Sequence, residues 1–121
     1  LLANGGASFD HILAKSGTGT LTIAGVDSTL DGVVNVTGGA LTITDFRSLA
    51  NNTSALNLGT TTTGVTLNIG TTTAATAAGL ITSKAIVLVG TTGGATINAN
   101  QAGTNPVVLN GTFTAGGAGT K

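Results

Sequence analysis

The chain has 121 residues with four basic and four acidic side chains, so its formal net charge is zero, and it contains no cysteine. Only 7% of the residues are charged and 2% are aromatic, so the chain has neither the basic stripe nor the aromatic platform of nucleic-acid-binding proteins. Its longest aliphatic run, residues 85–89, is much too short to cross a bilayer as a helix. We therefore expect no nucleic-acid partner and no membrane span.

Threonine and glycine dominate the composition, with roughly 25 threonines and 20 glycines. β-Branched residues favour strands over helices, and the 40% apolar content argues against a disordered chain. The length suits one domain with one modest core. The chain begins at Leu1 without a visible signal peptide, so we expect it to be a fragment of a longer polypeptide.

In chain order, residues 1–16 are the least regular, and residues 9–15 fit either a strand or a short helical turn. Alternation of aliphatic residues with Thr or Asn then predicts a series of short strands. These strands are expected at residues 21–23, 33–36, 41–43, 55–58, 65–69, 80–82, 85–89, 95–99, 106–110 and 112–114. Residues 46–50 could form one helical turn that packs Phe46 and Leu49. The run 85–89 is apolar throughout and is expected to be buried on both sides or to lie at a bend.

Strand centres recur at intervals of about 7 to 15 residues, which is typical of a β-solenoid, where each coil buries its inner face against its neighbours. Three-sided coils of about 20 to 30 residues give roughly four to six coils. We thus predict an all-β parallel β-helix in which residues 1–121 form a single segment, with 1–16 as an irregular lead-in and 17–121 as coils. The same spacing also fits an antiparallel β-sandwich. The scarcity of hairpin turn signals favours the solenoid.

The alternation also predicts which side chains face inward. We expect an interior of stacked aliphatic rows from Leu21, Ile23, Val34 or Val33, Leu41, Ile43, Leu56, Leu58, Leu67 and Ile69. We expect hydrogen-bonded ladders along the outside from Thr22, Asn35, Thr42, Asn57, Asn68 and Asn98.

Residues 17–43 carry the clearest repeat. They read Gly-Thr-Gly-Thr-Leu-Thr-Ile-Ala-Gly from Gly17 and Gly-Val-Val-Asn-Val-Thr-Gly-Gly-Ala-Leu-Thr-Ile from Gly32. This pattern resembles the autotransporter-associated β-strand repeat of very large bacterial surface and secreted proteins. The resemblance implies a right-handed parallel β-helix, export to the cell exterior and a structural or adhesive role, and it carries no catalytic residues. It covers about a quarter of the chain closely, residues 116–121 look like the start of another copy, and residues 26–31 depart from the Asn-Thr-Tyr-like segment common in the family.

The residues capable of chemistry are few and scattered. His11 stands alone, and nothing marks a nucleophile elbow or a triad around it. Asp27, Asp31 and Asp45 lie in polar corners, where turn chemistry explains them, although a carbohydrate-active β-helix would need such acids clustered along a groove. The glycine-rich end at 116–121 lacks the aspartate of a calcium-binding repeat. We predict no catalytic, cofactor-binding or metal site and no enzymatic activity.

The favoured function is a structural β-helical stalk or fibre segment of a large exported bacterial surface protein, supporting adhesion or an extracellular matrix. We expect it outside the cell or on the outer-membrane surface. The alternative is a glycan-binding or carbohydrate-active β-helix, and a flat, regular threonine array would favour a face that binds glycan or ice. The expected partners are neighbouring repeats of the same chain or end-to-end homotypic stacking, and host or matrix glycans.

Overall fold

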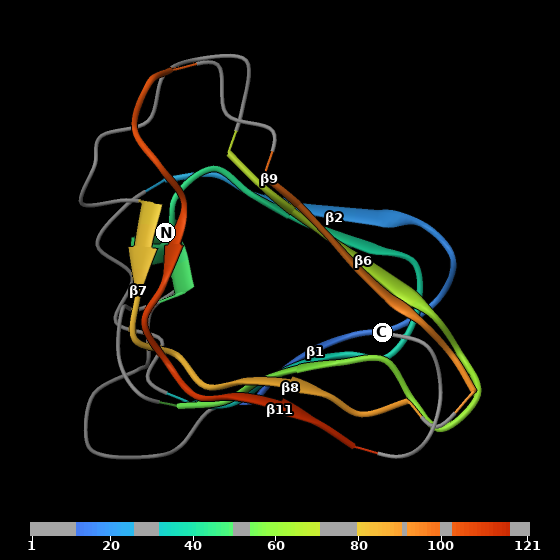
Figure 1. The fold of residues 1–121 in the computed structure, drawn as a ribbon. Helices are drawn as coiled ribbons and strands as arrows, with labels where there is room; N and C mark the ends of the chain where they lie inside the picture. Colours follow the sequence, from blue (N-terminus) through green and yellow to red (C-terminus); the bar gives the residue numbers. More distant parts are fainter. Residues whose placement is uncertain are drawn as a thin grey trace.

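The computed structural model describes residues 12–25, 32–49, 54–70, 80–90, 92–99 and 103–116. These residues wind into a three-sided coil, and each side is built of stacked strands (Figure 1). Every pair of neighbouring strands in the described ranges is parallel. Since a sandwich would require antiparallel pairing, the alternative fold is wrong and the predicted parallel β-helix is confirmed.

Each side of the coil collects strands from successive turns. The first side, sheet A, contains β1 (Leu13–Lys15), β3 (Val34–Val36), β5 (Leu56–Leu58), β8 (Ile86–Leu88) and β11 (Phe113–Ala115). The second side, sheet B, contains β2 (Thr20–Ile23), β4 (Ala40–Ile43), β6 (Val65–Ile69) and β9 (Ala95–Ala99). The third side contains the paired strands β7 (Ile81–Thr82) and β10 (Val108–Leu109), with the 3₁₀ helix η1 (Phe46–Leu49) on the same side (Figure 1).

Coil length varies while strand register does not. Asn57 stacks on Asn35 after 22 residues, Asn68 on Thr42 after 26, and Asn98 on Asn68 after 30. These intervals agree with the predicted 20 to 30 residues. The extra residues lie in the corners: β3 and β4 are joined by residues 37–39, whereas β5 and β6 are joined by residues 59–64.

The interior consists of aliphatic rows that run along the coil axis. In sheet A, Val34, Leu56 and Ile86 form one such row, and each is fully buried. Val34, and not Val33, is therefore the inward residue of its strand. All the other residues expected in the interior are buried or, for Leu21, packed against the core. A buried aliphatic side chain contributes about 1.5 to 3 kcal/mol, so the stacked rows are the main source of stability.

Most of the predicted elements are confirmed. Of the two alternatives for residues 9–15, the described part from Leu13 is a strand, β1. The run 85–89, expected to be buried on both sides or to lie at a bend, is not buried on both sides, because only Ile86 and Leu88 point inward. Its last residue, Val89, is 37% exposed and begins the corner between β8 and β9. The turn at η1 packs Phe46 and Leu49 into the core as predicted. Within the described ranges no helix is long and apolar enough to span a membrane.

Glycine is required where the corner between sheets A and B passes close to the preceding coil. Gly39 has a φ of +66°, and a Cβ built there would lie 2.3 Å from the backbone oxygen of Gly19. Gly38 is also tight, with a built Cβ 3.0 Å from the backbone oxygen of Gly17. The Gly-Gly pair therefore reflects both a left-handed turn and a backbone-to-backbone contact between coils.

We predict that Gly39→Ala lowers the free energy of unfolding by at least about 2 kcal/mol. The left-handed conformation alone costs a residue with a Cβ about 1 to 2 kcal/mol, and the contact with Gly19 adds to it. Gly19→Ala is the matched control, because a Cβ there meets nothing within 4 Å, and it should change stability by less than about 0.5 kcal/mol. Urea denaturation of both variants checks this, and equal losses would contradict the assignment.

Candidate functional site

The ionisable side chains of the described ranges are almost all withdrawn from the surface. Lys15, Asp45 and Lys84 are 8%, 5% and 0% exposed, and the side chain of Arg47, which pairs with Asp45, is 31% exposed. The outer surface that these ranges describe is therefore lined by hydroxyl, amide and aliphatic groups, with almost no charge.

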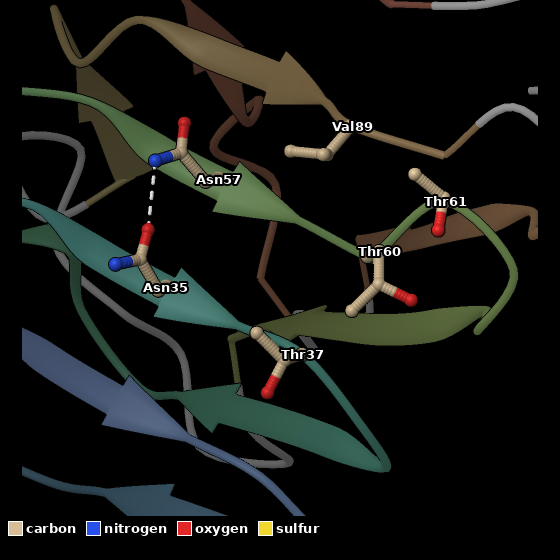
Figure 2. Close-up of a pocket in the computed structure, with 7 residues that line it drawn as sticks. Asn35, Thr37, Asn57, Thr60, Thr61 and Val89 are labelled. Atoms are coloured by element: carbon tan, nitrogen blue, oxygen red, sulfur yellow. Dashed lines mark hydrogen bonds between the residues drawn. The ribbon is translucent and has the colours of Figure 1, made fainter.

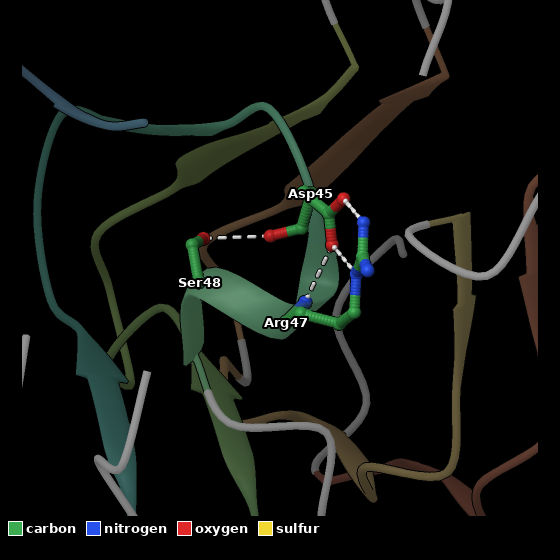
Figure 3. A network of polar contacts seen from close by, with 3 residues as sticks. All are labelled: Asp45, Arg47 and Ser48. Carbon is green, nitrogen blue, oxygen red and sulfur yellow. Dashed lines mark hydrogen bonds and ion pairs between the residues drawn. The ribbon is translucent and has the colours of Figure 1, made fainter. Parts of the chain in front are cut away.

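Asp45 is the one acid predicted as a possible groove residue that the structure describes. Its carboxylate accepts hydrogen bonds from the backbone nitrogen, Nε and Nη2 of Arg47 at 2.8, 3.0 and 2.7 Å, as Figure 3 shows. Its backbone oxygen accepts from the Ser48 hydroxyl at 2.6 Å. These contacts fix the start of η1 and occupy the carboxylate, so Asp45 has a structural role. His11, Asp27 and Asp31 lie outside the described residues.

A polar column crosses three coils at the corner that leads into sheet A. The ammonium of Lys84 donates to the hydroxyl of Ser54 at 2.8 Å, and that hydroxyl donates to the backbone oxygen of Gly32 at 2.9 Å. The next coil closes over Lys84, because a Cβ built at Gly111 would lie only 1.9 Å from the Lys84 backbone oxygen. Burial lowers the pKa of Lys84 from 10.5 to about 8.

The surroundings of Ser54 decide how the Lys84–Ser54 pair is interpreted. A serine nucleophile activated by lysine must be open to a substrate. Here the Ser54 hydroxyl lies between the ammonium of Lys84 and the backbone oxygen of Gly32, and Lys84 is fully buried. The pair is therefore arranged to satisfy buried groups between coils. The sequence pattern did not predict the Lys84–Ser54 pair. Its one sequence signal is a lysine placed two residues before an apolar strand.

The second buried lysine, Lys15, donates hydrogen bonds to backbone oxygens at another corner of the coil. Lys15 occupies an inward position of β1, in register with Val36, and its ammonium donates to the backbone oxygens of Ser16, Gly17 and Gly38 at 2.7, 3.0 and 3.0 Å. Its aliphatic stem thus lies over the interior of the first coil, and its ammonium group binds backbone carbonyl oxygens of the corner. The residue is structural, and nothing in its position suggests a binding role.

The outward amides form the ladders predicted from the sequence. On sheet A, Nδ2 of Asn57 donates to Oδ1 of Asn35 at 2.7 Å. On sheet B, Asn98 donates to Oδ1 of Asn68 at 2.9 Å, and Asn68 donates to the Thr42 hydroxyl at 3.2 Å. The outward row through Thr20, Ala40, Thr66 and Thr96 mixes residue types. The described strands of sheet B therefore do not form the regular threonine array that would favour ice binding.

An open groove of about 410 Å³ lies beside the sheet A ladder. It is lined by Asn35, Thr37, Asn57, Gly59, Thr60, Thr61 and Val89, most of which are drawn in Figure 2. The groove exists because residues 59–64 project past the shorter corner of the coil below. The alternation pattern predicted that the two asparagines face outward. It did not predict the groove, because the groove arises from corner loops of unequal length.

The loop above the groove is held by its own hydrogen bonds. The Thr60 hydroxyl accepts from the backbone nitrogens of Thr62 and Thr63, and the nitrogen of Thr60 donates to the oxygen of Thr63. The backbone oxygen of Thr61 accepts from the nitrogen and hydroxyl of Thr92 on the next coil. The wall of the groove is therefore shaped before any ligand arrives.

The comparisons with known proteins give no relative. No protein-family model, no curated protein and no solved structure matches this chain. Among the described residues, no group of three or more His, Cys, Asp or Glu side chains is placed to hold a metal ion. The groove, whose lining is uncharged and combines apolar surface with a few amide and hydroxyl groups, is the candidate binding site.

We predict that stability rises with pH above neutrality because of Lys84. Its folded-state pKa of about 8 lies below the ordinary 10.5, so between these values the unfolded chain binds more protons. The free energy of unfolding should therefore increase from about pH 8 to 10.5, by up to about 3 kcal/mol. Urea denaturation across this range measures it. Lys84→Met should remove most of the increase, and an unchanged pH dependence in that variant would contradict the assignment.

Proposed function

We propose that this chain is a structural segment of a β-helical stalk or fibre in a large exported bacterial surface protein that supports adhesion or an extracellular matrix. The observation that carries the proposal is the continuity of the stack. Sheet A runs through five strands in one register, and its interior row from Val34 to Ile86 is fully buried. A solenoid of this kind adds length coil by coil without altering its cross-section.

The hydrogen bonding suits a load-bearing role. Backbone bonds between coils run along the axis, as in Val34 N to Ala55 O at 3.0 Å on sheet A and Thr66 N to Gly39 O at 3.0 Å on sheet B. Separating two coils requires that the ladders of sheets A and B break together. The resistance to an axial pull is therefore shared among many parallel bonds.

Export and surface location are supported by the repeat-like sequence of residues 17–43 and by composition. The chain contains no cysteine, and its described part is stabilised mainly by burial and backbone pairing, with an ion pair between Asp45 and Arg47. Such a fold needs no disulfide to form outside the cell. These features extend the stalk proposal to the bacterial cell exterior.

Further coils of the same kind are the proposed partners. Among the described strands, β11 pairs with β8 alone, and Phe113, which continues the row of Ile86, is 54% exposed. An uncovered inward position and an unpaired strand edge both favour addition of another coil. We propose that neighbouring repeats of the same polypeptide or an end-to-end copy cover this edge.

We predict stepwise unfolding when the chain is pulled by its two ends in an atomic force microscope. One coil of 22 to 30 residues releases about 75 to 100 Å of chain at about 3.4 Å per residue. Force peaks at these spacings would support a load-bearing stack. Ile43→Asp, which places a charge in the core, should abolish the peaks nearest that coil. Extension without discrete peaks would contradict the mechanical role.

The proposed location of the chain on the bacterial cell surface is tested separately. Antibodies raised against this segment should label intact cells of the bacterium that produces it, because a stalk displayed at the surface is open to the medium. An antibody against a cytoplasmic protein of the same cells is the control for intactness. Labelling that requires permeabilised cells would contradict the surface assignment while leaving the mechanical result standing.

A further inference from the structure

The floor of the groove on sheet A can recognise a ligand only through side chains. Its floor is formed by β3 and β5, which lie in the middle of the sheet between β1 and β8. The backbone groups of these strands are engaged in the parallel ladders on both sides. A peptide therefore cannot add to this surface as a strand, and its own backbone groups would find few partners there.

The ladder at the floor leaves one acceptor and one donor group available. Asn57 uses Nδ2 to bind Asn35, so Oδ1 of Asn57 and Nδ2 of Asn35 point away from each other in Figure 2. Because the next outward residue of the row is Val87, which has no polar side-chain atom, the ladder ends at Asn57. The two amides thus leave one carbonyl oxygen and one N–H group available at the floor of the groove.

Hydroxyl groups complete the polar lining. The Thr60 hydroxyl already accepts two backbone N–H groups, so its own proton is available to donate outward. Thr37 donates to the backbone oxygen of Lys15 at 3.2 Å, which leaves its hydroxyl oxygen as an acceptor. Val89, 37% exposed, adds an apolar surface at the rim.

Charge limits the class of ligand. The lining contains no ionisable side chain. Lys15, in strand β1, and Lys84, just before strand β8, are both buried and hydrogen-bonded to other groups. An anionic or cationic ligand would lose its hydration without gaining a partner of opposite charge. The lining surface is mostly apolar, with a few amide and hydroxyl groups, and this combination matches the C–H faces and the hydroxyls of a sugar.

We propose that this groove binds a neutral oligosaccharide, with Asn35, Asn57 and Thr60 as the hydrogen-bonding residues and Val89 as the apolar contact. Its volume of about 410 Å³ falls within the range of small-molecule sites, about 300 to 1,000 Å³. The hydrogen-bonded loop above it reduces the ordering needed on binding. The site goes beyond the stalk role and does not depend on it, since the groove is a feature of the folded coil.

The test is titration of the full chain with cellotriose, chitotriose and mannotriose, followed by backbone amide chemical shifts in NMR. We expect at least one of these neutral trisaccharides, at millimolar concentration, to shift amides around Asn57, Thr60 and Val89. Asn57→Ala should weaken that binding about fivefold to tenfold, as expected for loss of a hydrogen bond. Val89→Asp, at an exposed position that the fold tolerates, should weaken it as well.

The chain contains a matched control on another face. Asn98→Ala removes a ladder bond of similar length, that to Asn68, but lies on sheet B outside the groove. This variant should bind the sugar as the unaltered chain does. The proposal is overturned if none of the three sugars shifts groove amides, if Asn98→Ala weakens binding as much as Asn57→Ala, or if an uncharged Gly-Thr-Asn peptide or sialyllactose binds the groove and the neutral sugars do not. None of these results bears on the force peaks that test the stalk role.

Discussion

The constraint on which this structure depends is the register between successive coils. Each strand must place its inward side chains over those of the strand below, because a shift of one residue would turn the aliphatic row outward. The isoleucines at positions 23, 43 and 69 follow one another in this way on sheet B. Core, backbone pairing and outer ladders all depend on this single alignment, so they are gained or lost together.

The corners are where the chain departs from strict repetition. The corner at Gly38 and Gly39 follows the preceding coil so closely that side chains are excluded. The next corner, residues 59–64, is longer and extends well beyond the corner below it. A longer corner changes neither the register nor the core, since both are defined by the strands. Variation in these loops therefore creates local surface features, such as the groove, on a frame that remains constant.

The parts of the fold that repeat were predictable from the sequence, and the parts that do not repeat were less so. Alternation placed the strands and the inward residues, and the stacking of Asn35 with Asn57 was foreseen because both occupy the outward middle position of their strands. The role of Lys84 was not foreseen, since a lysine in a corner gives no sign that the next coil will cover it. The groove, too, depends on the relative lengths of two loops, which no single strand pattern encodes.

The asparagine ladders have a direction. In each asparagine pair the amide nitrogen points toward the N-terminal coil and the carbonyl oxygen toward the C-terminal coil, as in Asn57 to Asn35 and Asn98 to Asn68. The outside of the coil is therefore chemically different when viewed from its two ends. A coil added after Asn98 in the same orientation can donate a hydrogen bond to Oδ1 of Asn98. A coil added in the inverted orientation would break the parallel pairing of the backbone. The amide side chains thus give the outer surface the same direction as the parallel strands beneath it.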